Sequence, residues 1–227
     1  MNDQHYFTAS PETPAEERRH HFVIRGTEHD VTTASGVFSA DRLDLGTRVL
    51  LKQVPQPPQT GTFLDLGCGW GPLTLALADA APQATVLATD VNERAVELTG
   101  RNAADAGHTR VRAVLADALL AELRDSGTRL NLIWSNPPMR IGKPALHTLL
   151  TDWLELLADD GEAWLVVQKN LGADSLAKWL GEQGWQVERA ASSKGYRLLR
   201  VSHRPVPPTE IGRSYVPRSV EVTYRGR

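Results

Sequence analysis

The sequence has a single cysteine, no excess of positive charge and no long apolar run. Cys68 stands alone, which excludes an intrachain disulfide and a zinc site built from several cysteines. The 25 Lys and Arg residues are balanced by 27 Asp and Glu residues, so any contact with RNA or DNA must use a local basic patch. The seven histidines show no metal-ligand spacing, and no metal site is expected.

Two further absences concern the membrane and secretion. No apolar stretch approaches the roughly 20 residues that a membrane-spanning helix needs. The first residues are polar and mixed in charge, unlike a secretory signal. We therefore expect a cytoplasmic protein with no membrane partner. Nothing in the sequence indicates its oligomeric state.

The length and composition predict one substantial core with a small additional element. The chain has 227 residues, of which 41% are hydrophobic, enough for a single large domain. We predict a flexible arm over 1–19, a β-hairpin and helix cap over 20–58, a main domain over 59–204 and a tail over 205–227. The tail is rich in Pro and Arg, and its composition fits both an extended basic strap and a disordered end.

The cap is predicted from two short β-prone runs and one helical pattern. The runs at 20–25 and 28–33 flank Gly26, which is typical of a hairpin. A helix is predicted over 41–54, because its apolar residues fall on one side and Pro55 ends it.

From residue 61 onward, the pattern alternates between strands and helices. This alternation predicts a doubly wound, mostly parallel sheet with helices on both faces. The predicted strands are 62–66, 85–89, 111–116, 130–135 and 162–168, followed by a closing antiparallel pair at 185–190 and 196–203. The predicted helices are 72–80, 92–106, 143–157 and 173–183.

A turn with three glycines separates the first of these strands from its helix. Gly67, Gly69 and Gly71 allow backbone angles that other residues resist, and they let main chain approach a ligand closely. The turn lies at the carboxyl edge of the sheet, where ligands bind in such folds. A dinucleotide site would need a further glycine where Pro72 stands. Asp65 would repel a pyrophosphate but could pair with an ammonium, which favours S-adenosylmethionine over NAD.

The next two strands also end near acidic residues. Asp90 ends its strand at a position that suits hydrogen bonds to ribose hydroxyls, and its neighbour Val91 is a candidate cofactor contact. Asp117 is predicted to end the third strand and, with Ala118, to meet the adenine amino group. Cys68 completes the candidate cofactor set, because its small size suits the glycine turn. Either aspartate taken alone is more often a helix cap or loop residue than a ligand, but three acidic residues at successive strand ends favour a cofactor site.

The sequence Asn136-Pro137-Pro138 follows the fourth strand. An exocyclic amine on an aromatic ring is a poor nucleophile, and acceptors for its two N–H groups can orient its nitrogen. The Asn136 side-chain oxygen and the Pro137 carbonyl suit this role, and the prolines stiffen the loop. A substrate without this amino group would leave both acceptors without hydrogen bonds, which costs free energy, so the acceptors also confer selectivity. In isolation, this motif would be interpreted as a simple turn that ends a strand. Because it follows the glycine turn in the same sheet, we predict that it clamps an amino group. We also expect Asn136 to lie beside the cofactor.

Charged residues flank this clamp. Arg140 and Lys143 follow it directly, and Lys169 is predicted at the end of the fifth strand. They could contact phosphates of an RNA substrate. The alternative is that they are solvated surface charges, and the sequence leaves both possibilities open.

The chain resembles the class I S-adenosylmethionine-dependent methyltransferases, and more narrowly the compact, single-domain members of the small-subunit ribosomal RNA guanine-N2 methyltransferase-like family. The resemblance covers roughly residues 20–204. It is carried by four motifs: Ser35-Gly36-Val37-Phe38-Ser39, Leu43-Asp44-Leu45-Gly46-Thr47, Asp65 to Gly71, and Asn136 to Lys143.

The resemblance implies a Rossmann-like, seven-stranded methyltransferase sheet with S-adenosylmethionine as cofactor. It also implies that the segment around Phe38 covers the cofactor, and that the target base is turned out of its stack. The expected acceptor is an exocyclic amino nitrogen, namely that of guanine in ribosomal RNA, with ribosomal RNA or a ribosomal subunit as partner.

The sequence departs from the family pattern at two points. Many related clamps have an aromatic residue next, to stack on the base, whereas this chain has Met139, a flexible thioether that packs on a ring less specifically. The longer members carry a second, duplicated domain. Two alternatives therefore stay open: methylation of a protein glutamine or a small aromatic amine, and a catalytically silent RNA-binding or assembly factor.

Overall fold

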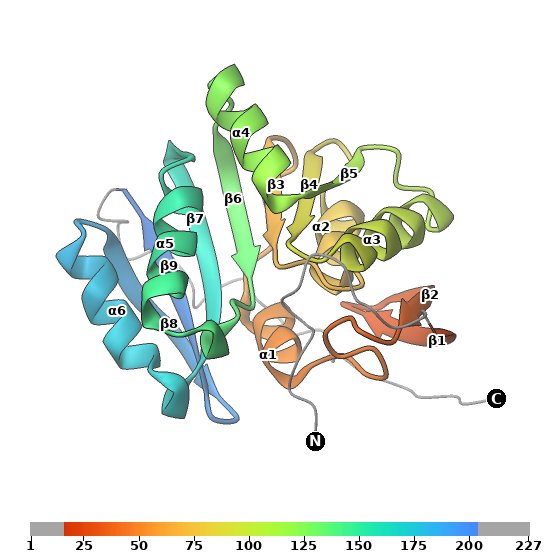
Figure 1. The fold of residues 1–227 in the computed structure, drawn as a ribbon, viewed down its shortest axis with the longest axis horizontal. Coiled ribbons are helices and arrows are strands. Elements are labelled where there is room, and N and C mark those ends of the chain that lie inside the picture. The colour runs from red at the N-terminus through yellow and green to blue at the C-terminus, as the bar shows by residue number, and fades with distance from the viewer. Residues whose placement is uncertain (1–15, 204–227) are drawn as a thin grey trace.

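The computed structural model of the chain describes residues 16–203, so the predicted tail and most of the predicted arm lie outside it. Its main feature is a seven-stranded sheet with the order β5-β4-β3-β6-β7-β9-β8 (Figure 1). Strands β3 to β7 are parallel, and β9 runs antiparallel to both β7 and β8. The strands are β3 (Thr62–Leu66), β4 (Thr85–Asp90), β5 (Val111–Leu115), β6 (Leu130–Ser135), β7 (Leu157–Gln168), β8 (Gln186–Ser193) and β9 (Tyr196–Ser202).

Helices cover both faces of the sheet, and each face has its own apolar core. Successive side chains of a strand point to opposite faces, and accordingly Phe63 joins one core whereas Leu64 joins the other. The first core contains residues of α1 (Leu45–Gln53), α2 (Pro72–Ala80) and α3 (Glu93–Asp105), and the second contains residues of α4 (Ala116–Ser126), α5 (Lys143–Leu154) and α6 (Ala173–Glu182). Among residues 16–203, no helix is both long and apolar enough to cross a membrane. The predicted doubly wound, seven-stranded architecture is confirmed.

The N-terminal hairpin is a separate two-stranded sheet made of β1 (Glu17–Ile24) and β2 (Thr27–Ala34). It packs on the first core, where Phe22 stacks on Trp70 with ring centroids 5.0 Å apart. The buried Asn102 side chain of α3 accepts from the Thr32 N–H at 2.8 Å and donates to the Thr32 carbonyl at 2.9 Å. The hairpin is therefore joined to the elements that follow the glycine turn.

The helix of the cap is shorter than predicted. It begins at Leu45 rather than at residue 41, because Asp44 is its N-cap. The Asp44 side chain accepts from the backbone N–H groups of Gly46 and Thr47, which have no partner within the helix.

Other elements also differ from the sequence-based prediction, and α5 ends at Leu154 rather than at residue 157. Helix α4 was not predicted, although Leu119 and Leu123 lie four positions apart and are both buried. Strand β7 begins at Leu157, five residues before the predicted start, and its pairing with β6 is irregular between Leu130 and Leu132. Gly161 lies at this irregularity, where a Cβ atom would stand 2.6 Å from the Leu130 carbonyl.

Candidate active site

The glycine turn and the Asn136 clamp leave two neighbouring strands at the same edge of the sheet. The chain runs from β3 outward through β4 and β5, and then returns to place β6 on the other side of β3. Leu66 and Ser135, the last residues of β3 and β6, are opposite each other, and the Ser135 hydroxyl donates to the Leu66 carbonyl at 2.7 Å. This reversal of strand order is where open α/β sheets bind ligands.

Backbone hydrogen bonds hold the glycine turn. The N–H groups of Gly67 and Cys68 both donate to the Thr89 carbonyl at 2.9 Å. The Thr99 hydroxyl donates to the Gly69 carbonyl at 3.0 Å. Gly67 and Gly69 have φ angles of 83° and 58°, which glycine adopts at no steric cost. The shape of the turn is therefore set by main chain and by the neighbouring strand β4.

Asp65 lies beneath this turn and is completely buried, with 0% of its surface exposed. Its Oδ2 accepts from the Thr74 hydroxyl at 2.6 Å, whereas Oδ1 has no hydrogen-bond partner. Burial raises the pKa of Asp65 to about 7, because a charged carboxylate is poorly solvated there. Asp65 does not line the pocket described below.

Asp90 is the last residue of β4, and its side chain is hydrogen-bonded to the glycine turn. Its Oδ2 accepts from the Gly69 N–H at 3.1 Å and its Oδ1 from the Asn92 N–H at 3.0 Å. A carboxylate has about four acceptor positions, so both oxygens keep capacity for hydroxyl groups. Burial raises the pKa of Asp90 above its ordinary value. Val91, the next residue, is exposed.

Asp117 and Ala118 lie elsewhere than the sequence predicted. Both are exposed in the first turn of α4, and Asp117 therefore does not end a strand. Leu115, the last residue of β5, is paired with Asp90 in the sheet, so α4 begins beside the end of β4. Neither residue lines the pocket that contains the turn and the clamp.

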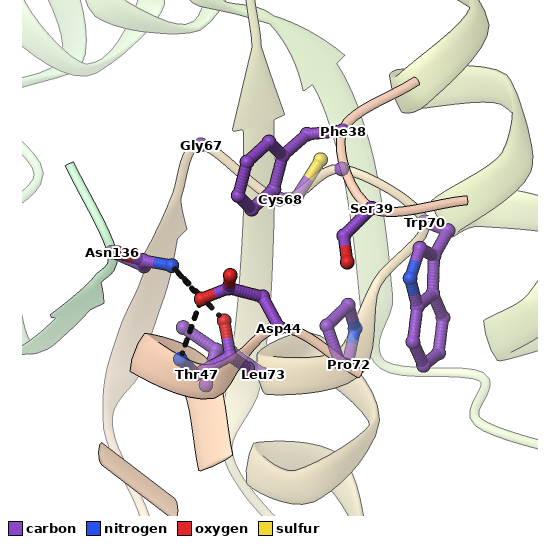
Figure 2. Close-up of a pocket in the computed structure, with 11 residues that line it drawn as sticks. Phe38, Ser39, Asp44, Thr47, Gly67, Cys68, Trp70, Pro72, Leu73 and Asn136 are labelled. Carbon is purple, nitrogen blue, oxygen red and sulfur yellow. Dashed lines mark hydrogen bonds between the residues drawn. The ribbon is translucent and has the colours of Figure 1, made fainter. Parts of the chain in front are cut away.

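Asn136 is held by side chains of α1 and its cap. Its Nδ2 donates to Asp44 Oδ2 at 2.9 Å and to Thr47 Oγ1 at 3.2 Å (Figure 2). Within residues 16–203, its Oδ1 accepts no hydrogen bond. Pro137 is buried and Pro138 is half-buried. The clamp thus presents a fixed amide whose oxygen is free.

One pocket contains both the turn and the clamp (Figure 2). Phe38, whose side chain is 48% exposed, lies against the turn with its ring beside Cys68. The loop that carries Phe38 is held by Asn92, whose Nδ2 donates to the Gly36 carbonyl at 2.8 Å. The pocket is lined by Phe38, Ser39, Asp44, Thr47, Gly67, Cys68, Gly69, Trp70, Pro72, Leu73 and Asn136.

The sequence interpretation gave no role to Asp44, Thr47 or Tyr196. A Cβ atom on Gly46 would stand 2.9 Å from Tyr196 Cε1 and 3.2 Å from Asn136 Nδ2, so Tyr196 closes against the same turn of α1. Burial, and after it the charge of Asp44, raises the pKa of Tyr196. Asp44 and Thr47 belong to a motif that the family resemblance identified, but Asp44 and Asn136 are 92 positions apart. No local pattern connects them.

The candidate substrate-contacting residues lie on two short 3₁₀ helices at this edge, η1 (Met139–Ile141) and η2 (Lys169–Leu171), and at the start of α5. Arg140, Lys143 and Lys169 are exposed. Lys143 and Lys169 form no ion pair within the described part of the chain. Met139 is half-buried and packs against the second core. In residues 16–203, no group of three His, Cys, Asp or Glu side chains could hold a metal ion.

A comparison with protein families decides the class of this domain. The model of the family described as "Methyltransferase small domain" matches residues 28–200. The chain belongs to this family. The match includes β2, the cap helix, the glycine turn and the clamp of this methyltransferase domain.

The chain is also similar to individual proteins. The chain is 36% identical to the uncharacterized protein YbxB of Bacillus subtilis over 87% of this chain and 97% of that protein. It is 34% identical to ribosomal RNA large subunit methyltransferase G of Streptomyces coelicolor over 66% of this chain, but it spans only 40% of that relative. A solved 16S rRNA N2 methyltransferase from T. thermophilus, in complex with AdoMet and guanosine, shares the fold with a TM-score of 0.69 at 24% identity, over 86% of this chain and 52% of that one.

Proposed function

We propose that this methyltransferase domain transfers a methyl group from S-adenosylmethionine to the exocyclic amino nitrogen of guanine in ribosomal RNA. One observation carries the proposal: the glycine turn and Asn136 directly follow Leu66 and Ser135, which are paired at the same edge of the sheet, and both line one pocket. The names of relatives that act on ribosomal RNA, and the fold shared with an enzyme bound to AdoMet and guanosine, support the choice of acceptor.

The residues around the turn suit the cofactor. The unpartnered Oδ1 of Asp65 becomes a buried negative site next to the turn when the carboxyl group loses its proton, and the methionine ammonium and the sulfonium are both cations. Because Asp65 is fully buried, its charge acts on the methionine part through the turn. Asp90 would hold the ribose, and Phe38 and Val91 offer apolar surface. S-adenosylmethionine supplies a methyl group that is already activated on a sulfonium, so no covalent enzyme intermediate is required.

We also propose that Asp117 and Ala118 recognise the adenine. Both residues are on the outer side of Asp90, along the direction in which β4 and β5 extend the sheet. An adenine that follows a ribose held by Asp90 would extend toward them.

The clamp suits an aromatic amino group. The free Oδ1 of Asn136 and the carbonyl of Pro137 would accept from the two N–H groups of the acceptor. Hydrogen bonds to both hydrogens hold the nitrogen in one orientation, and positioning of this kind can contribute up to about 7–11 kcal/mol to catalysis. Pro137 and Pro138 reduce the freedom of the loop that carries these acceptors.

Binding of RNA would use the exposed charges next to the clamp. Arg140 and Lys143 flank it, and the Lys169 N–H donates to the Gly195 carbonyl at 2.8 Å, which places Lys169 beside the β8–β9 turn and Lys194. Basic side chains at one edge suit phosphate contacts. Because Met139 packs partly against the second core, a flipped base would receive less stacking here than from an aromatic residue.

Methyl transfer from labelled S-adenosylmethionine tests the proposal. Protein-free ribosomal RNA, ribosomal subunits and an RNA-free protein extract are offered separately, and the labelled product is digested and identified. We expect label in RNA as N2-methylguanosine, and about 10²–10³-fold slower labelling with Asn136→Ala. Label only in the protein extract would instead favour the glutamine alternative. Folded protein that neither binds S-adenosylmethionine in a calorimetric titration nor transfers label would contradict the proposal.

A further inference from the structure

The first turn of α1 holds the Asn136 side chain through a single carboxylate oxygen. Asp44 Oδ2 accepts from the Gly46 N–H at 2.7 Å and the Thr47 N–H at 3.2 Å, and the same oxygen accepts from Asn136 Nδ2 at 2.9 Å. Two of these donors fix the carboxylate on the helix end. The third donor is Asn136 Nδ2, so the Asn136 side chain is held in place relative to the first turn of α1.

The contact also selects one of the two possible orientations of the Asn136 amide. Both N–H groups of Nδ2 have acceptors, because Thr47 Oγ1 lies 3.2 Å away in addition to Asp44. A flipped amide would place Oδ1 against the Asp44 carboxylate, where two negative oxygens repel each other and the carboxylate loses a charge-assisted hydrogen bond. The favoured orientation leaves Oδ1 free, which is the atom that an amino group needs.

On the side that faces Gly46, there is little space beside this contact. The position that a Cβ atom on Gly46 would occupy lies within 3.2 Å of Asn136 Nδ2 and within 2.9 Å of the Tyr196 ring. A glycine at this position therefore lets the helix end approach both Asn136 and the Tyr196 ring closely. The arrangement leaves Asn136 little freedom to change its side-chain conformation.

We infer that Asp44, assisted by Thr47, is a positioning residue that holds the Asn136 amide with its oxygen toward the acceptor amine. The inference rests on the proposed function, because it assigns the orientation of the same clamp. Asp44 acts through Asn136, so its contribution should vanish when Asn136 is removed.

A double-mutant cycle at saturating cofactor and RNA measures this dependence. Asp44→Ser keeps a good N-cap but its side chain is too short to reach Asn136. We expect it to lower kcat about 10- to 100-fold, since small misplacements of reacting groups have effects of about 100-fold. Asp44→Asn keeps an oxygen at the cap and should restore kcat to within a few-fold of wild type. In the Asn136→Ala background, Asp44→Ser should change kcat less than twofold, because residues that act through one another are not additive.

Asp41→Ser is the matched control. Asp41 lies in the same segment and is exposed, and it pairs only with the exposed Arg18 in the described part of the chain. We expect wild-type kcat from it. An equal loss of kcat from Asp44→Ser with and without Asn136, or an Asp44→Asn variant as slow as Asp44→Ser, would overturn the inference.

A spectrum gives a second readout that needs no substrate. In ¹⁵N–¹H correlation spectra, the side-chain amide pair of Asn136 is assigned by its disappearance in Asn136→Ala. Asp44→Ser should shift this pair strongly, and Asp41→Ser should leave it in place. An unmoved pair in Asp44→Ser overturns the positioning role even if no methyl transfer is found, and a shifted pair in an inactive protein means that the proposed function has failed but the positioning contact is real.

Discussion

The glycine turn and the Asn136 clamp leave adjacent strands, yet they are held in different ways. The turn is held by main-chain groups of the neighbouring strand, with two N–H groups on the Thr89 carbonyl. The clamp is held by side chains that precede it by 89 and 92 positions, those of Thr47 and Asp44. The turn thus depends on backbone conformation, and the clamp depends on two distant side chains.

Because of this difference, we expect substitutions in the turn and in the clamp to affect different properties of the protein. A change in the turn alters φ angles that the fold requires, so it should lower both stability and cofactor affinity. A change at Asn136 or its partners alters polar groups at a half-buried position, so it should lower the rate and leave the fold intact. Substitutions in the turn, in the clamp and beside them test this difference.

The largest effect should come from Asn136→Ala. It removes the acceptor that orients the amine, and loss of one such oriented group lowers kcat by about 10²–10³. The melting temperature should change little, and calorimetric titration should still detect cofactor binding. Activity within a few-fold of wild type would mean that Asn136 is a structural turn residue.

Asp65→Asn should remove a pH dependence of stability. Folded Asp65 keeps its proton up to about pH 7, whereas an unfolded aspartate releases it near 3.8. Between these values the native state binds more protons, so the free energy of unfolding of the apo protein falls as pH rises, by about 1.4 kcal/mol per pH unit. Above pH 7 this contribution stays lost.

Denaturant titrations from pH 5 to 8 measure this slope in both proteins. Asp65→Asn should be less sensitive to pH and more stable than wild type at pH 8, but it should bind S-adenosylmethionine more weakly. In wild type, cofactor affinity should increase as Asp65 ionises through pH 7, because a bound cation favours the carboxylate. Parallel slopes in the two proteins would refute the assignment of the raised pKa to Asp65.

A smaller difference, in the free energy of unfolding, is expected between alanine variants at two glycines of the same turn. Gly67 and Gly71 have positive φ angles of 83° and 98°, so alanine is strained at both, by about 1–2 kcal/mol. A Cβ atom would meet nothing within 4 Å at Gly67, but it would lie 3.2 Å from the Thr99 side chain at Gly71. Gly71→Ala should therefore lower the free energy of unfolding more than Gly67→Ala. Equal denaturation midpoints for the two variants would show that backbone strain, and not the contact with Thr99, determines the loss of stability.

The smallest effect should come from Lys169→Ala. If Lys169 contacts a phosphate, RNA affinity should fall similarly for all sequences, and the slope of log K against log salt should decrease by about 1. Lys178→Ala is the control, because Lys178 is an exposed lysine farther along α6 that pairs with Glu182. The same salt slope in both variants would exclude a phosphate contact at Lys169.

Much of the fold could be predicted because each element has a local signature. Helix α3, the turn and the parallel sheet were predicted correctly from local signals. Asn92 is a residue type that caps helices, and it is the N-cap of α3; the glycines and the apolar strands are equally local. Helix α4 escaped prediction because Ala116 and Asp117 follow a strand without a separating loop. Its start was therefore interpreted as the end of that strand.

The candidate site was predictable in part for the same reason. Asn136 and the turn could be expected at one edge from strand order alone, since parallel strands end together. The role of Asp44 could not be predicted, because it depends on how α1 packs against β7 and β9. Such a tertiary contact has no local sequence signal.

A crystal structure with S-adenosylmethionine bound is the most direct test of a single site shared by turn and clamp. We expect the methionine part against Gly67 and Gly69, and the sulfonium methyl group facing Asn136, with room for an acceptor nitrogen at about 3–3.5 Å. A cofactor bound outside this pocket, or a methyl group directed away from Asn136, would contradict the account.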